Sequence, residues 1–257
     1  MRFNPRFLCL MLVCSVLMGP AAGSVWATAV VNGSARLNWP VSISGDISWT
    51  ERTSESGAFA ANENDSDQDS EVLSGWGVAT SAFAQVSTAT ASASTQSTML
   101  QTSVWAMADG VAAADSFADT LARRHGYFTA NSDGVVMLTA SYEVILSLQT
   151  EQPGEHAEGH STAYVRLGRA VTPNEWDLDE LYLHGSVKDG AVLNDSETGF
   201  LSVQLWFDAG DVGYLEMAAT GMGHVTPEPA SLVMVCVGFG LTALRRRLRV
   251  MALLAAG

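Results

Sequence analysis

Between residues 28 and 226 the chain alternates apolar and polar side chains in short stretches, and turn signals recur about every ten residues. The clearest stretch is Gly134–Gln149 (GVVMLTASYEVILSLQ), which is rich in β-branched and aromatic residues and follows the turn sequence NSDG. A period of two places successive side chains on opposite faces of a strand, which a helix cannot reproduce. We therefore predict a mainly β protein with an antiparallel β-sandwich or jelly-roll-like body.

The same pattern recurs along the body. Further strands are predicted at 28–49, 162–171, 181–187, 200–208 and 213–219. The Ala/Ser/Thr-rich residues 77–108 also alternate, and long strands are favoured there over flexible low-complexity chain. Residues 111–124 are ambiguous, because some apolar residues have helical spacing. A strand is favoured there, since the rest of the body is β.

Residues 1–27 have the organisation of a secretory signal peptide. Arg2 and Arg6 give a positive start, and the apolar run FLCLMLVCSVLM follows as a signal helix. This run is shorter than the roughly 20 residues that span a bilayer. Ala27 supplies a small residue, with the small aliphatic Val25 two positions before it, so cleavage by signal peptidase is predicted between Ala27 and Thr28.

The C-terminal end combines three features. Pro227-Glu228-Pro229 precedes a short apolar stretch at about 231–244, which we expect to form a short transmembrane helix. Arginines stay on the cytoplasmic side of a bacterial membrane, so both ends begin inside and the body lies outside. Residues 251–257 would then be a cytoplasmic tail. The arginines that stop the membrane passage are Arg245, Arg246, Arg247 and Arg249.

Residues 227–250 resemble the PEP-CTERM sorting signal, whose proteins also carry an N-terminal signal peptide. The resemblance implies recognition by an exosortase, a membrane-embedded cysteine transpeptidase or protease, and cleavage near the motif. It also implies transient residence in the inner membrane and delivery to the cell surface or to the extracellular polysaccharide of a Gram-negative, biofilm-forming bacterium. Thr226 departs from the valine that the family often has before the motif. Residues 250–257 prolong the chain past the arginines, which leaves a retained anchor as an alternative.

The body is strongly acidic, with seven Lys and Arg residues against 26 Asp and Glu residues between positions 28 and 226. This balance excludes nucleic acid as a partner, because a phosphate backbone requires a basic face. Cys9, Cys14 and Cys236 all lie outside the body. The body therefore has no disulfide, no thiol nucleophile and no cysteine zinc site.

The densest polar run is residues 62–71 (NENDSDQDSE). Asp65, Asp67 and Asp69 alternate in it, as oxygen ligands do at the start of a calcium-binding loop. An EF-hand is excluded, because Ser70 stands where that loop requires glycine. A solvated, flexible loop is the favoured interpretation, and weak calcium binding is the alternative. No other cofactor is predicted.

His156 and His160 flank Glu158, which suggests a zinc site. The zinc-protease motif requires a helix, however, and Pro153, Gly154 and Gly159 oppose one here. A solvated turn is therefore the favoured interpretation.

A second group of acidic residues surrounds Trp176. Paired carboxylates beside an aromatic ring occur in glycosidase clefts, but an acidic loop before a strand is the commoner arrangement. The acidic residues are Glu175, Asp177, Asp179 and Glu180. The body tryptophans are expected mainly in the core.

Together these features predict an exported cell-surface or extracellular-matrix protein with a structural or adhesive role and no catalytic activity. Signal peptidase and an exosortase would act on it during export, and extracellular polysaccharide is its expected partner. The alternatives are a carbohydrate-binding or ice-binding module and, less favoured, a secreted hydrolase. An exposed tryptophan platform would indicate sugar binding, a regular threonine array ice binding, and a cleft with facing carboxylates hydrolysis.

Overall fold

The computed structural model describes residues 28–109, 115–170 and 175–226. The predicted signal peptide, the sorting signal with its transmembrane stretch, and the cytoplasmic tail lie outside these ranges. The described part consists of strands and contains no helix. The strands are β1 (Thr28–Ser44), β2 (Ile47–Asn62), β3 (Ser66–Ser74), β4 (Thr80–Val86), β5 (Ala89–Gln96), β6 (Met99–Asp109), β7 (Ser116–Ala130), β8 (Gly134–Gln149), β9 (His156–Arg169), β10 (Trp176–Lys188), β11 (Val192–Phe207) and β12 (Val212–Thr226).

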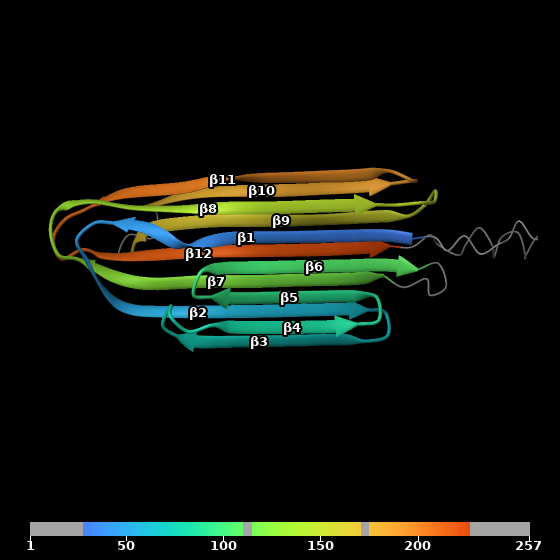
Figure 1. The fold of residues 1–257 in the computed structure, drawn as a ribbon, viewed down its shortest axis with the longest axis horizontal. Coiled ribbons are helices and arrows are strands. Elements are labelled where there is room, and N and C mark those ends of the chain that lie inside the picture. Colours follow the sequence, from blue (N-terminus) through green and yellow to red (C-terminus); the bar gives the residue numbers. More distant parts are fainter. Residues whose placement is uncertain (1–27, 110–114, 171–174, 227–257) are drawn as a thin grey trace, which may run out of the picture.

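The strands form two six-stranded sheets that lie face to face (Figure 1). The first sheet has the order β11-β8-β1-β6-β5-β4, and the second has the order β10-β9-β12-β7-β2-β3. Neighbouring strands pair antiparallel in both sheets. The predicted mainly β class with antiparallel sheets is confirmed, and the arrangement is that of a β-sandwich.

One apolar core fills the space between the sheets, because alternate residues of each strand point inward. On β4 and β5 the inward residues are small, and Ala84 and Ala91 are fully buried. On β8 and β9 they are large, as Leu146 and Leu167 illustrate. The strands predicted for 77–108 are confirmed as β4, β5 and β6, although β4 and β5 are short, with 7 and 8 residues.

The ambiguous segment after residue 111 is a strand where it is described, since β7 begins at Ser116. Several other strands are longer than predicted. β9, for example, begins at His156 rather than near residue 162, and β11 begins at Val192 rather than near residue 200. The added residues are mostly polar or small, and cross-strand pairing holds them in the sheet despite their weak strand preference.

The first and last strands lie in different sheets, and the start of β1 and the end of β12 lie at the same end of the sandwich (Figure 1). β1 begins at Thr28, and β12 ends at Thr226. No helix in the described ranges is long and apolar enough to cross a membrane.

Candidate binding face

The outer face of the second sheet carries most of the side chains that could bind a ligand or exchange a proton. All five histidines of the chain point outward from this sheet, although it contributes only half of the strands. The corresponding side chains of the first sheet are mainly serine, threonine, asparagine and glutamine, with one ion pair, between Arg36 and Glu143. The histidines are His125, His156, His160, His184 and His224.

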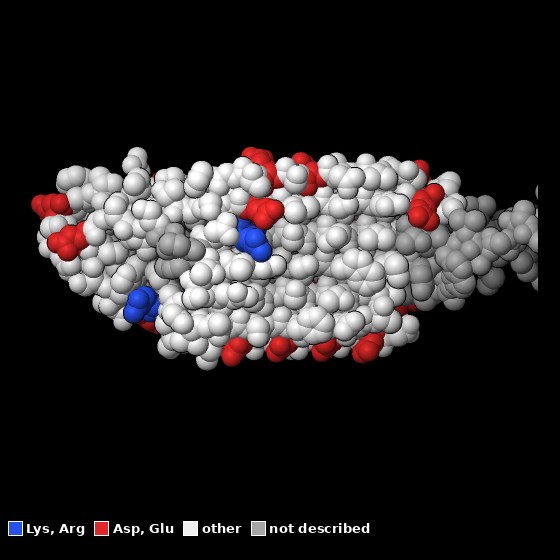
Figure 2. Space-filling view, in the orientation of Figure 1, with Lys and Arg blue, Asp and Glu red and all other residues white. Residues whose placement is uncertain are grey.

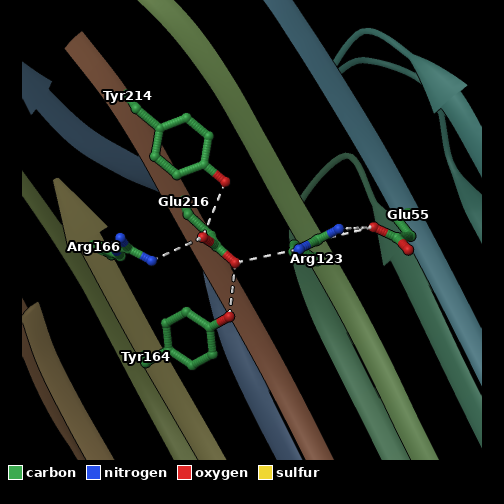
Figure 3. Close-up of polar contacts among 6 residues, drawn as sticks. All are labelled: Glu55, Arg123, Tyr164, Arg166, Tyr214 and Glu216. Atoms are coloured by element: carbon green, nitrogen blue, oxygen red, sulfur yellow. Dashed lines mark hydrogen bonds and ion pairs between the residues drawn. The ribbon is translucent and has the colours of Figure 1, made fainter. Parts of the chain in front are cut away.

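Glu216 on β12 lies at the centre of a polar network on this face (Figure 3). The hydroxyls of Tyr164 and Tyr214 donate hydrogen bonds to its two carboxylate oxygens, at 2.8 and 3.0 Å. Arg123 lies 3.6 Å from one oxygen, and Arg166 lies 4.0 Å from the other. Glu216 is only 6% exposed, so its charge is compensated inside the protein rather than by water.

The pKa values of two tyrosines and one arginine in this network are shifted from their ordinary values. Burial, followed by the bond to Glu216, raises the pKa of Tyr164 well above its ordinary value. Burial and the charge of Glu216 act in the same direction on the pKa of Tyr214. Burial alone would lower the pKa of Arg123, but the hydrogen bond and charge of Glu55 outweigh it and the net shift is upward. Tyr164, Tyr214 and Arg123 therefore keep their protons at neutral pH, and none of these three is prepared to act as a general base there.

A hollow of about 330 Å³ lies beside this network, and we call it the Trp176 hollow. The guanidinium of Arg166 lies over the ring of Trp176, 4.9 Å from its centroid. Gly168 pairs with Trp176 across β9 and β10, and a Cβ on Gly168 would come within 2.9 Å of the Cβ of Trp176. The glycine thus allows the indole to lie close against β9. The lining residues used below are Arg123, Tyr127, Arg166, Arg169, Trp176 and Tyr214.

A second hollow, of about 490 Å³, lies on the other side of the network, over β2, β3 and β7. Gly57 forms its floor, where a Cβ would meet no atom within 4 Å. Phe59 and Asp119 line it, so it combines an aromatic ring with a single carboxylate on β7. Asp69 of β3 also lines it, but its carboxylate accepts the backbone N–H of Phe83 on β4 in the facing sheet, so this carboxylate and that of Asp119 are not arranged as the facing pair of a glycosidase.

The acidic run predicted as a flexible loop is largely strand β3, at the edge of the second sheet, and the loop interpretation is wrong for residues 66–71. Asp67 and Asp69 occupy inward-facing positions opposite buried alanines of β2. Their carboxylates accept the backbone N–H groups of Gln85 and Phe83 on β4, at 2.9 and 3.1 Å. The backbone amides of an edge strand lack a partner in their own sheet, and here acidic side chains of the facing sheet satisfy them.

Glu71 continues this pattern by accepting the N–H of Ser81 at 2.9 Å. Asp65, the third calcium candidate, instead lies in the turn before β3, where its N–H bonds to the side chain of Asn62. Acidic side chains line the lower margin in Figure 2, where Figure 1 places β3 and β4. Within the described ranges no group of three or more potential ligands is arranged to hold a metal ion.

At the opposite margin of the sandwich, carboxylates of one sheet again accept backbone N–H groups of an edge strand in the facing sheet. Asp177 and Asp179 lie on β10, and their carboxylates accept the N–H groups of Gln204 and Ser202 on β11, at 2.9 and 2.7 Å. The expected acidic loop is therefore strand from Trp176 onward, and two of its carboxylates serve the sheet edge. Glu175 directly precedes the strand and forms an ion pair with Arg169 at 3.3 Å.

His156 and His160 lie on β9, so the predicted solvated turn is also wrong. His160 pairs across the strands with His184, and Tyr182 lies 5.5 Å from the His160 ring. Burial lowers the pKa of His160 below its ordinary value, although the charges of Asp119 and Glu158 act in the opposite direction. Glu158 pairs at 3.8 Å with His184 rather than bridging the two predicted ligands.

The tryptophans divide between core and surface. Trp76 is buried, and Trp49 packs against the core beside it. Trp176 and Trp206 are 45% and 52% exposed, and for Trp206 this is contrary to the expectation of a core position. They point outward from different sheets, so they do not form one platform.

No local sequence pattern indicates the Glu216 network, because its members come from β2, β7, β9 and β12. One clue was available: of the seven basic residues of the acidic body, four lie on β7 and β9, although one of them, Arg124, is fully buried. Comparison with known proteins adds nothing to this assignment, since no protein-family model and no curated protein matches the chain. The geometry of the face therefore carries the functional argument.

Proposed function

We propose that this chain is an exported, exosortase-sorted protein of the cell surface or extracellular polysaccharide matrix, with a structural or adhesive rather than catalytic role. The observation that carries the proposal is the junction at the end of the body. β12 ends at Thr226, and Pro227 of the sorting motif follows at once. The motif thus adjoins a strand at the centre of the second sheet.

Proline chemistry suits this junction. Pro227 and Pro229 cannot donate to a sheet or continue a helix, and Pro227 favours an extended conformation at Thr226. The motif would therefore remain open chain between the body and the membrane, where an enzyme can bind it as a strand. The apolar stretch would fix its height, and Arg245 and its neighbours would stop the tail from sliding outward.

The test is cell fractionation with immunoblotting, in a host that has the exosortase and in one that lacks it. Replacing Pro227-Glu228-Pro229 with alanines should leave the protein exported, uncut and bound to the membrane. Neutral replacements of the four tail arginines should instead release unprocessed protein into the periplasm. Processing of the alanine variant like the wild type, or identical processing in both hosts, contradicts the proposal and supports a plain tail anchor.

A jelly-roll-like sandwich that binds carbohydrate is the second candidate, and the Trp176 hollow favours it. Most connections cross from one sheet to the other, as in a jelly roll. Ice binding has weaker support, because outward Thr90 pairs with Trp105 and Ser92 with Ser103, which is not a regular threonine array. Weak calcium binding has no support from Asp67 and Asp69, whose carboxylates already accept backbone amides.

A further inference from the structure

We propose that the Trp176 hollow binds an acidic saccharide, with Arg166 pairing with the carboxylate of a uronic acid and Trp176 stacking against the sugar ring. This inference rests on the proposed function, because it names the kind of matrix polymer that the body would hold. It concerns the second sheet alone and requires no catalytic step.

The charge of the hollow differs from that of the rest of the body. Three arginines line it against one carboxylate, Glu175, whereas acidic residues greatly outnumber basic ones over residues 28–226 as a whole. Glu216 adds a negative charge, but it lies beneath the surface and is 6% exposed. A carboxylate therefore meets an excess of guanidinium groups here, although the body as a whole carries a large negative charge.

Arg166 is the arginine best placed to accept a new anion. Arg123 is held by Glu55 through two hydrogen bonds, and Arg169 forms ion pairs with Glu175 and Asp211 at 3.3 and 3.1 Å. Among the described residues the ion pair of Arg166 is the 4.0 Å contact with Glu216, and its side chain is 40% exposed. Stacking on Trp176 fixes the plane of its guanidinium, which lowers the entropy cost of binding a carboxylate through two parallel hydrogen bonds.

The aromatic rings make a saccharide a better fit than a simple anion. Trp176 and Tyr127 are 45% and 37% exposed, and the ring centroids of Tyr214 and Tyr127 lie 5.1 Å apart. Exposed aromatic rings offer apolar faces to the C–H side of a sugar, while their polar edges remain in water. The volume of about 330 Å³ lies at the lower end of the range for small-molecule sites, about 300–1,000 Å³.

The experiment measures binding of trigalacturonate to the full chain in detergent by titration calorimetry, with neutral maltotriose and inorganic phosphate as comparison probes. Arg166→Gln and Trp176→Ala should each weaken trigalacturonate binding by about tenfold or more. Arg36→Gln is the matched control. Its side chain is also 40% exposed and has a single long ion pair, at 3.7 Å, but it lies on the first sheet. This variant should bind like the wild type.

Each alternative outcome overturns the inference. These outcomes are no trigalacturonate binding by the wild type, an equal loss in Arg36→Gln, equal binding of maltotriose, or phosphate binding as tight as that of the saccharide. Circular dichroism of each variant excludes loss of folding as the cause. Fractionation tests the proposed function separately. A protein that is sorted but does not bind overturns only this inference, and one that binds but is never exported overturns only the proposed function.

Discussion

Glu216 holds together the polar network on the outer face of the second sheet. It receives two tyrosine hydroxyls and two arginines while lying almost fully buried. Sequence reasoning could not find it, because β12 reads as an ordinary alternating strand and its partners lie far away in the chain. Only the strand register brings Glu216 beside Arg166 on β9.

Glu216→Ala should lower the free energy of unfolding by about 2–4 kcal/mol, since it leaves two partly buried hydroxyls and Arg123 without their shared acceptor. Urea denaturation monitored by circular dichroism measures the change. Glu143→Ala is the control, because Glu143 is 46% exposed in its pair with Arg36 and should cost less than about 1 kcal/mol. Equal costs for the two variants would contradict a special role for Glu216.

His160 gives the stability a defined pH dependence. Its pKa in the folded state lies below the ordinary 6.5, mainly through burial, so the unfolded chain takes up a proton first as the pH falls. The contribution of His160 is therefore fully present above pH 6.5 and is lost as the pH falls through the lower, folded pKa. His160→Gln should flatten the decline in the free energy of unfolding between about pH 7 and pH 5. His156→Gln, on the same strand, is the control, and an unchanged slope in His160→Gln would contradict the argument.

At the scale of the strand, alternation predicted the elements with apolar inner faces well and the acidic edge strands poorly. The segment Gly134–Gln149 has large inward residues, so its pattern identifies β8 directly. β3 has acidic residues at its inward positions, and from the sequence alone these resemble a loop. Their purpose depends on β4 in the facing sheet, which no local pattern encodes.

The triple variant Asp67→Ala, Asp69→Ala and Glu71→Ala should lose three charge-assisted hydrogen bonds to β4, each worth about 1.5–3 kcal/mol at most in a well-ordered site. It should also associate with itself, because uncapped edge strands pair with other chains. Denaturation and sedimentation measure the two effects. The control, Gln68→Ala with Ser70→Ala, changes only outward positions of β3. A triple variant that is monomeric and as stable as the control would show that the carboxylates do not protect the edge.

At the scale of the whole molecule, one thin sandwich joins two unlike outer faces. The first sheet presents an almost uncharged face, and the second presents histidines, arginines and tyrosines. Both termini of the described body lie at the same end (Figure 1). A body tethered through Thr226 would therefore stand with its strands pointing away from the membrane and with both faces free to meet the matrix.

The shared core predicts that this sandwich unfolds as one unit, although its two halves are filled differently. Ala91→Leu should overpack the half built on alanine, at a cost of about 1–3 kcal/mol. Leu146→Ala should leave a cavity in the half built on leucine and valine, at a cost of about 2–5 kcal/mol. Because the inward residues of both halves belong to one continuous cluster, each variant should shift the entire transition without splitting it.

Thermal unfolding followed by tryptophan fluorescence and by far-ultraviolet circular dichroism measures whether the transition stays single. Fluorescence reports on all tryptophans, among which Trp49 packs against Trp76 and Phe128, and circular dichroism reports on all strands. Transitions that coincide in the wild type but separate in either variant would mean that the halves are independent units.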